Sequence, residues 1–293
     1  MFSWLVVLSA ILKNRPFQLP VRGRYIVSRC FASLDNEIID SELPDIVTTT
    51  NNTVIGGHIY FVATPIGNLN DISKRAVSTL SQVDVICAED TRHTHRLLNL
   101  LKIENKKVIS HHEHNYKEQI PHIIHALQTG KSIAVVSDAG TPGISDPGAQ
   151  LAEACHDNDI PVHPVPGASA VISALSVSGF PASLFTFFGF APVKGTERAA
   201  RLSSLAACTH TAALFEAPHR VVRTLQELAR DHGQGGRPCV CCRETTKLHE
   251  ELVRGTVDEC ASRLSDRQEK DGKVCALPPA INSSLTLFSN CEV

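Results

Sequence analysis

The stretch IAVVSDAGTPGISDPG, residues 133–148, decides the fold class of this chain. The apolar run from Ile133 to Val136 is typical of a buried parallel strand. The next twelve residues contain three glycines, two prolines and two aspartates, more turn-forming residues than a simple connector needs. Such a loop exposes backbone groups with carboxylates beside them, which suits an adenosine-type ligand.

Short apolar runs recur on both sides of this stretch and alternate with helical patterns. Residues 120, 123, 124 and 127, for example, are apolar at the spacing of an amphipathic helix. We expect strands at 58–63, 83–88, 108–110, 133–136 and 160–165, and a second series at 184–188, 211–216, 238–243 and 250–254. Helices are expected at 168–178, 196–207 and 219–230. The alternation predicts the α/β class, with two α/β domains and largely parallel sheets.

The Pro-rich segment 160–167 separates the two series. The sequence therefore predicts an N-terminal α/β domain at 58–166 and a C-terminal α/β domain at 167–264. Residues 1–57 are expected to be a transit peptide and a disordered spacer, and residues 265–293 a divergent C-terminal tail.

Charge is distributed unevenly over the first 57 residues. Residues 1–34 contain five basic side chains and no acidic one, whereas residues 35–57 contain five acidic side chains and no basic one. The first composition is typical of an organelle transit peptide, and its apolar run precedes the basic residues, the wrong order for a secretory signal. We expect a chloroplast or a mitochondrion. The alternative is a disordered tail without an address, which would leave the protein in the cytoplasm.

Composition excludes several classes of protein. The 293 residues are 43% hydrophobic and 20% charged, with a net charge of -2, as in an ordinary globular protein. The apolar stretch 5–12 is shorter than the roughly 18 residues of a membrane span, so no membrane partner is expected. Any contact with nucleic acid must come from a local basic patch. The ten cysteines are irregularly spaced and are expected to be reduced.

No metal is expected from the sequence. The run His111–His114 contains three histidines and a glutamate, but consecutive residues on or after a strand point in alternating directions and do not converge on one ion. Cys239, Cys241 and Cys242 fall in an expected buried strand, where thiols serve as small apolar side chains.

Seven segments together resemble the ribosomal RNA small-subunit methyltransferase I family, which belongs to the tetrapyrrole-methylase-like S-adenosylmethionine methyltransferases. They are TPIGNL (64–69), AEDTRH (88–93), SDAGTPGISDPG (137–148), PGASA (166–170), FGF (188–190), EAPHR (216–220) and RETTK (243–247). The resemblance implies two α/β domains with S-adenosylmethionine bound in an inter-domain cleft, and a homodimer. It also implies 2′-O-methylation of a cytidine ribose in the decoding region of small-subunit rRNA.

The site residues follow from these segments. Candidate cofactor-binding residues are Pro65, Ile66, Gly67, Asp138, Ala139, Gly140, Thr141, Ser145, Asp146, Gly167, Ser169 and Gly189. A ribose hydroxyl needs a base for its proton, and the candidate catalytic residues are Glu89, Asp90, His93, Glu216 and His219. Candidate RNA-binding residues are Arg92, Arg220, Arg243 and Lys247, whose cationic groups suit phosphates. The arginines at 198, 201, 223 and 230 are interpreted as solvated helix surface.

The chain departs from the family pattern after residue 264, where a final apolar strand is expected and is not evident. Either a divergent strand such as 285–288 replaces it, or the second sheet keeps an open edge. Two alternatives to the rRNA methyltransferase stay open. One is a methyltransferase of the same fold that acts on a tetrapyrrole or a protein. The other, which the altered C-terminus suggests, is a non-catalytic relative that binds rRNA.

Overall fold

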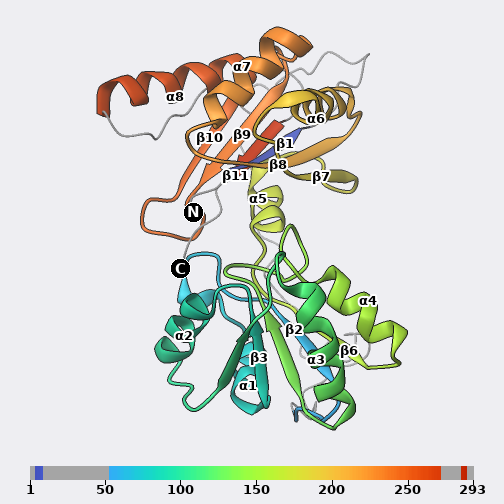
Figure 1. Ribbon diagram of the computed structural model, residues 1–293. Helices are drawn as coiled ribbons and strands as arrows, with labels where there is room; N and C mark the ends of the chain where they lie inside the picture. The colour runs from blue at the N-terminus through green and yellow to red at the C-terminus, as the bar shows by residue number, and fades with distance from the viewer. Residues whose placement is uncertain (1–3, 9–52, 272–284, 289–293) are drawn as a thin grey trace, which may run out of the picture. The chain divides into compact units, whose positions relative to one another are not determined.

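The computed structural model describes residues 4–8, 53–271 and 285–288, which form two β-sheets flanked by helices (Figure 1). The predicted α/β class and the division into two sheets are confirmed. The last strand of the first sheet ends at Val165 and the next helix starts at Ala170, so the expected boundary falls in the segment that joins the two sheets. No helix in these described ranges is both long and apolar enough to cross a bilayer.

Five parallel strands make up the first sheet, in the order β4-β3-β5-β2-β6. Their bounds are Ile59–Val62 (β2), Val85–Ala88 (β3), Lys107–Ser110 (β4), Ile133–Val136 (β5) and Val162–Val165 (β6). The strands β3 and β5 are buried along their whole length, as expected where helices cover both faces. Because the strands are parallel, the loops after them all lie at one edge of the sheet.

Helices cover both faces of this sheet. One face is covered by α1 (Lys74–Gln82) and α2 (Thr91–Leu100), and the other by α3 (Tyr116–Gln128) and α4 (Ala149–Asp157). A 3-10 turn, η1 (Leu69–Asp71), precedes α1. Ser73 and Asp90 cap α1 and α2 by accepting hydrogen bonds from backbone N–H groups of their first turns, which fixes where each helix begins. The apolar positions expected for the third helix are its buried face, with Ile123 and Leu127 each 1% exposed.

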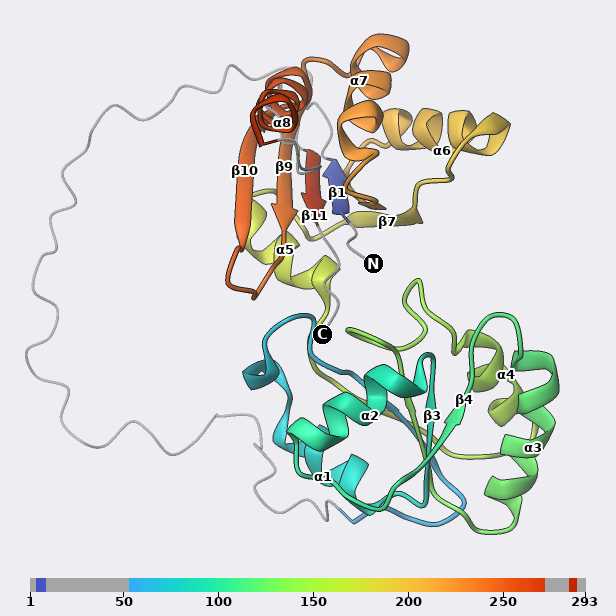
Figure 2. The ribbon, with the colours of Figure 1, turned by 60° about the vertical axis from the view of Figure 1, so that its left-hand side comes forward.

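The second sheet is mixed, in the order β10-β9-β11-β1-β8-β7 (Figure 2). Its strands are Trp4–Leu8 (β1), Phe185–Phe190 (β7), Thr211–Glu216 (β8), Pro238–Arg243 (β9), Glu251–Thr256 (β10) and Leu285–Phe288 (β11). The pairs β7–β8 and β9–β11 are parallel, while β9–β10 and both pairings of β1 are antiparallel. The expectation of parallel strands therefore holds for the first sheet and for only part of the second.

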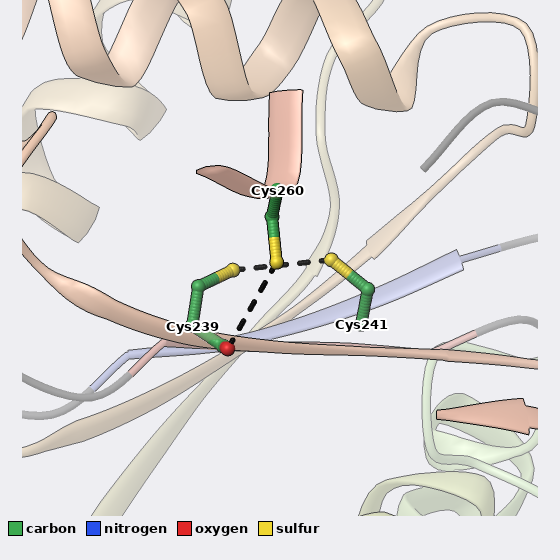
Figure 3. Close-up of side chains that lie close together, drawn as sticks. All are labelled: Cys239, Cys241 and Cys260. Carbon is green, nitrogen blue, oxygen red and sulfur yellow. Dashed lines mark hydrogen bonds between the residues drawn. The ribbon is translucent and has the colours of Figure 1, made fainter. Parts of the chain in front are cut away.

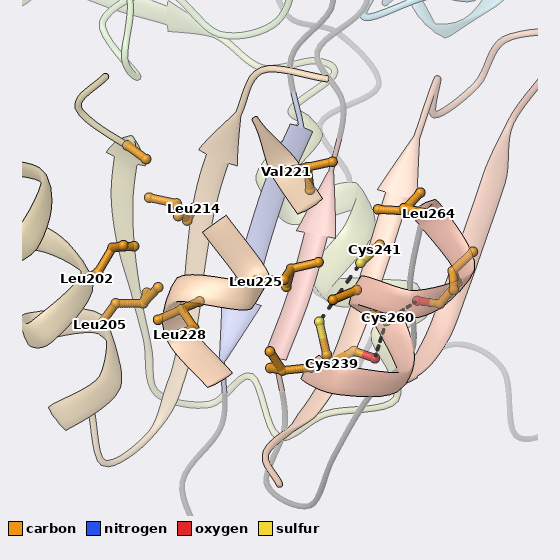
Figure 4. Packing of buried hydrophobic residues seen from close by; sticks show 14 of the residues in the cluster. Leu202, Leu205, Leu214, Val221, Leu225, Leu228, Cys239, Cys241, Cys260 and Leu264 are labelled. Atoms are coloured by element: carbon orange, nitrogen blue, oxygen red, sulfur yellow. Dashed lines mark hydrogen bonds between the residues drawn. The ribbon is translucent and has the colours of Figure 1, made fainter. Parts of the chain in front are cut away.

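Two hydrophobic cores sandwich the second sheet. On one face lies α5 (Ala170–Ser178), packed against apolar residues of β8 and β9. On the other face α6 (Gly195–Ala207), α7 (Val221–His232) and α8 (Val257–Asp271) pack with leucines and cysteines of the core shown in Figure 4. The left-handed glycines Gly179 and Gly233 end α5 and α7, a position where a Cβ atom would be strained.

Two strands of the second sheet come from segments that were expected to lie outside the domains. The strand β1 belongs to the expected leader, residues 1–57. Of the rest of that leader, only residues 53–57 lie within the described ranges. The strand β11 belongs to the divergent tail, and it pairs with both β9 and β1. Of the two alternatives for the missing strand, the structure has the replacement at 285–288.

Both terminal strands pair with the same position of β8. Phe215 pairs with Leu5 of β1 and also with Phe288 of β11, while its other side pairs with Phe190 of β7. A strand has only two edges, so β1 and β11 share one edge of β8 at this residue.

Candidate active site

The loops after β2, β3, β5 and β6 meet at the carboxyl edge of the first sheet, because these strands are neighbours in it. Backbone hydrogen bonds join the first and third of these loops, from Thr64 N to Gly140 O at 2.8 Å and from Gly140 N to Thr64 O at 3.1 Å. The hydroxyl of Thr141 donates to the carbonyl of Ala168 at 3.1 Å. The loops that the sequence singled out are therefore one connected structure.

Two glycines allow this close approach. Gly140 has a φ of +90°, in the region that residues with a Cβ rarely adopt. A Cβ placed on Gly167 would lie 2.9 Å from the Cβ of Ala63, nearer than two carbon atoms pack. Both positions therefore require glycine if the loops are to keep their contacts.

The linked loops line a pocket together with residues of α5 and β8. Its lining is apolar with a few polar groups, and consists of Ile66, Ala139, Gly140, Thr141, Ile144, Asp146, Ser169, Ala170, Val171 and Phe215. Six of these are among the twelve cofactor-binding residues that the sequence predicts. An apolar wall with a small number of placed polar groups is the usual character of a small-molecule site.

The chemistry of this pocket fits an adenosine-type cofactor, but its present volume does not. Ile66 and Phe215 offer apolar surface to a base, and the carboxyl group of Asp146 can accept hydrogen bonds from hydroxyls. The free volume is about 20 Å³, whereas small-molecule sites usually hold at least about 300 Å³. Cofactor binding therefore requires the lining side chains or loops to move apart.

A group of carboxyl groups lies beside this pocket, from the loops after β3 and β5. The backbone N–H of Asp90 donates to Oδ1 of Asp138 at 3.1 Å, and the N–H of Asp138 lies 3.5 Å from Oε2 of Glu89. Burial, and then the charge of Glu89, raises the pKa of Asp146 to about 7. Burial is also the largest cause that raises the pKa of Glu89 and of Asp138. This concentration of half-buried carboxyl groups favours a cationic ligand.

The helix that follows Glu89 brings two further candidates to this group. Asp90 binds Arg92 through its side chain and caps α2, and these hydrogen bonds hold the pKa of Asp90 well below its usual range. His93 is half-buried, and its Nδ1 atom has no hydrogen-bond partner in the part of the chain that the structure describes. Asp90 is therefore a weak base, whereas Glu89 and His93 keep proton-accepting atoms.

Gly67 lies at a different hollow from its neighbour Ile66. A Cβ on Gly67 would be 2.7 Å from Cγ of Lys247 and 3.1 Å from the carbonyl oxygen of Thr245. The hollow is lined by Gly67, Asn68, Leu69, Glu244, Thr246, Lys247, Leu248 and His249. The structure thus places predicted RNA-binding residue Lys247 against the loop after β2, outside the pocket described above.

Glu216 is fully used by a buried network of hydrogen bonds and ion pairs. Its Oε2 accepts from the hydroxyl of Thr224 at 2.6 Å and from Nη1 of Arg198 at 3.2 Å, and its Oε1 accepts from the backbone N–H of Ala217 at 2.8 Å. Nη2 of Arg220 lies 2.7 Å from Oε1. Glu216 is 0% exposed. Its carboxylate therefore holds the end of β8 to α6 and α7, and is not placed to accept a substrate proton.

This network also changes the interpretation of two arginines. Arg198 was expected on the solvated face of its helix, but it is 3% exposed. The expectation was wrong, because periodicity does not reveal a buried carboxylate. Arg220, a candidate for RNA binding, uses one guanidinium nitrogen on Glu216, and its Nε and Nη1 atoms are buried. Arg198 is buried, and only 13% of the Arg220 side chain is exposed.

The remaining predicted residues are more scattered. Arg92 is exposed and paired with Asp90, Arg243 lies 3.8 Å from Glu251 across the β9–β10 pair, and His219 is exposed after β8. Ser145 and Gly189 lie together, since a Cβ on Gly189 would be 3.3 Å from Oγ of Ser145. Pro65 and Gly167 belong to the linked loops without lining the pocket.

Sequence reasoning missed four lining residues, namely Ile144, Ala170, Val171 and Phe215. Ile144 lies inside the quoted loop, but an apolar side chain in a polar, glycine-rich loop gives no signal of a ligand contact. Phe215 belongs to a continuous apolar strand and gives no signal that distinguishes it from the core. It becomes part of a site only because three loops of the first sheet meet this strand of the second sheet.

Comparisons with known proteins agree on one family. Residues 58–261 match the model of the tetrapyrrole (corrin/porphyrin) methylases. The chain is 47% identical over 219 residues to a ribosomal RNA small subunit methyltransferase I of Synechocystis sp., an alignment that covers 75% of this chain and 77% of that protein. A protein of the same name from Thermotoga maritima is 46% identical over 212 residues, with 72% and 94% covered.

Solved structures resemble the fold at lower identity. A cobalt precorrin-4 methyltransferase superposes with a TM-score of 0.55 at 20% identity, covering 75% of this chain and 92% of that one. The uroporphyrin-III C-methyltransferase of Thermus thermophilus gives a TM-score of 0.52 at 18% identity, with 80% and 94% covered. At these identities the likeness concerns the arrangement of helices and strands.

Proposed function

Because the chain belongs to the ribosomal RNA small subunit methyltransferase I family of the tetrapyrrole methylases, we propose that it methylates small-subunit rRNA. The proposed reaction transfers the methyl group of S-adenosylmethionine to the 2′-hydroxyl of a cytidine ribose. One observation of the structure carries the proposal, namely the pocket that the linked loops after β2, β5 and β6 line with Phe215 of β8.

The chain's own residues account for the positioning of the methyl donor and for the removal of the ribose hydroxyl proton. When bound, S-adenosylmethionine supplies a methyl group activated by its positive sulfonium. The carboxyl groups of Asp138 and Asp146 favour such a cation, and displacement at its methyl carbon needs chiefly an acceptor oxygen held in line. Glu89 and His93 keep free proton-accepting atoms beside Asp138. We assign the proton of the ribose hydroxyl to Glu89, because burial raises its pKa and makes it a stronger base.

The RNA is proposed to approach the hollow beside Gly67. Lys247 and Thr246 line this hollow next to η1, and a lysine and hydroxyls suit phosphate contacts. With a net charge of -2, the protein has no general attraction for nucleic acid. Recognition is therefore proposed to depend on a local groove on an assembled ribosomal particle.

We further propose an organelle as the site of action and a homodimer as the active form. The support for the organelle is the leader-like composition of residues 1–34, with five basic residues and no acidic one. The homodimer is what the family resemblance implies. Microscopy of a fluorescent fusion of the full chain, and light scattering of the purified protein, test these two statements separately.

The test of the activity uses the purified full chain, tritiated S-adenosylmethionine and small ribosomal subunits that lack the modification. Expected is label in a cytidine ribose of the small-subunit rRNA, with none on large subunits. Calorimetric titration with S-adenosylhomocysteine provides an independent measure of the pocket. Cofactor binding without transfer to any subunit would contradict the proposed acceptor, and a folded protein that binds no cofactor would favour the non-catalytic alternative.

A further inference from the structure

Three cysteines from two separate elements converge in the core on one face of the second sheet. Cys239 and Cys241 are two residues apart on β9, so their side chains point to the same face. Cys260, in the first turn of α8, points toward both of them (Figure 3). The three sulfur atoms all lie within 4.8 Å of one another, and those of Cys239 and Cys241 are 3.9 Å apart.

The 3.9 Å between the sulfur atoms of Cys239 and Cys241 matches the separation of two thiolates bound to a single ion, and the sulfur of Cys260 lies within 4.8 Å of both. With metal–sulfur bonds of about 2.3 Å, tetrahedral or trigonal geometry places two ligand sulfurs about 3.8 to 4.0 Å apart. Among the described residues, this is the one group of three close side chains with metal-binding atoms. The histidine run at 111–114 forms no such group there.

The surroundings also suit bound thiolates. All three cysteines are 0% exposed, so water is not placed to compete for the ion. The guanidinium of Arg237 lies in the same core, where it donates to the carbonyl oxygens of Leu205 and Cys208, and it interacts electrostatically with Cys239. This cation offsets the negative charge that three thiolates leave on one divalent ion.

From this geometry we propose that Cys239, Cys241 and Cys260 form a structural three-thiolate site for one thiophilic ion, either Zn²⁺ or Cu⁺. Binding forms three metal–sulfur bonds and releases the displaced thiol protons to solvent. The ion joins β9 to α8 and thereby fixes the outer part of the second sheet. The site faces away from the core that contains Ile66 and Phe215, so it acts on stability and takes no part in methyl transfer.

Cys242 provides a matched control. It is a buried cysteine of the same strand, but it belongs to the core on the opposite face, beside Val240. Replacing it removes a buried thiol from β9 without touching the three-sulfur group. Cys260→Ala removes one sulfur of the group and keeps a good helix former in α8.

The experiment titrates the reduced, metal-free full chain with Zn²⁺ alone and, without oxygen, with Cu⁺ alone in competition with a chromophoric chelator. Expected is one ion per chain for the wild type and for Cys242→Ala, with a higher Tm for the loaded protein. Cys260→Ala is expected to lose stoichiometric binding. Element analysis of the protein as purified identifies which of the two ions it carries, because raw affinity does not decide which metal a site takes in the cell.

A second measurement does not depend on a variant. Cd²⁺ added to the wild type is expected to produce an ultraviolet thiolate-to-metal band whose intensity corresponds to three sulfurs. A folded wild type that binds none of these ions would overturn the proposal. Equal loading of Cys260→Ala and Cys242→Ala would overturn it too, as would a mass two hydrogens lower that shows a disulfide within the group.

Discussion

The backbone N–H of Asp90 donates to Oδ1 of Asp138 at 3.1 Å, which ties the loop after β3 to the loop after β5. The two loops are 48 residues apart in the chain, and each follows a strand of the same parallel sheet. This hydrogen bond joins the loop with the residues proposed to accept the ribose hydroxyl proton to the loop with the residues proposed to bind the cofactor. The side chain of Asp138 therefore helps to fix the relative position of the two groups, together with the contact between its own N–H and Glu89.

Asp138→Ala is expected to weaken cofactor binding by roughly ten- to a hundred-fold, since a hydrogen bond to a charged group contributes about 1.5 to 3 kcal/mol. Calorimetry with S-adenosylhomocysteine measures the loss. Asp157→Ala, at an exposed position at the end of α4, is the control and should bind normally. Unchanged affinity in Asp138→Ala would contradict the place given to this loop.

The raised pKa of Asp146, about 7, predicts a pH dependence of stability. The native state keeps a proton that the unfolded chain, near the ordinary value of 3.8, has already lost. Stability should therefore fall as the pH rises from about 4 to about 7, by at most about 1.4 kcal/mol per pH unit from this group, and level off above. Urea unfolding gives the free energy of unfolding of the wild type and of Asp146→Asn across this pH range. The wild type should lose stability relative to the variant as the pH rises, and parallel pH curves would contradict the prediction.

The same carboxyl group predicts how ligand charge and pH interact. S-adenosylmethionine and S-adenosylhomocysteine differ at the sulfur, where only the first is cationic. As Asp146 ionises above about pH 7, the preference for the cationic ligand should grow by roughly 1 kcal/mol, about five-fold. Paired titrations at several pH values give this ratio. Asp146→Asn should make it independent of pH, and a wild type with a constant ratio would argue against an ionised Asp146 near the sulfonium.

Gly67→Arg is expected to abolish methylation of ribosomal subunits. A side chain at this position meets Lys247 at 2.7 Å and the backbone carbonyl of Thr245 at 3.1 Å, so the loop at 244–249 must be displaced. Tritium transfer to subunits measures the effect, and Gly67→Ala should give a smaller loss because it lacks the long side chain. Asn70→Ala, exposed in the neighbouring η1, is the control. Cofactor affinity distinguishes the hollow beside Gly67 from the pocket lined by Phe215. If Gly67 contributes to RNA binding, Gly67→Arg should lower cofactor affinity less than it lowers methyl transfer.

Substitution of Glu216 should lower stability, whereas substitution of Glu89 should lower activity. Glu216→Ala removes the carboxylate that pairs with Arg220 and leaves the buried Arg198 with Glu227 alone, and a loss of about 3 to 5 kcal/mol in the free energy of unfolding is expected. Glu89→Gln should keep its stability within about 1 kcal/mol and lower kcat by about 100-fold or more. Denaturant unfolding and single-turnover transfer distinguish the two. A Glu89→Gln protein with normal kcat would move the role of base to His93.

Removal of residues before 58 is expected to leave a protein with a cooperative melting transition. β11 pairs with β9 and, at Phe288, with Phe215 of β8, so it can connect the two halves of the second sheet without β1. Calorimetry of this truncated chain tests the expectation. Removal of residues after 271 should lower the Tm more, because β9 then loses its parallel partner. The reverse order would show that β1 is the strand that completes the sheet.

The sequence alone determined the α/β class, the alternation of strands and helices from residue 58 to about residue 254, and the loops that carry the candidate cofactor site. These features depend on local patterns, namely apolar runs of strand length, helical spacing and turn-forming residues. Each such pattern is contained in a short continuous segment of the chain. The linkage of Thr64 to Gly140 also follows from them, because the carboxyl ends of neighbouring parallel strands lie at one edge.

Only the tertiary structure decided which side chains are partners. Glu216 and Arg198 look like a candidate base and a surface cation in the sequence, yet they form a buried pair at 3.2 Å. Phe215 resembles any core residue until a loop of the first sheet covers it, and Cys260 is an isolated cysteine until α8 lies over β9. Contacts between residues far apart in the chain depend on how sheets and helices pack, and local pattern carries no information about that packing.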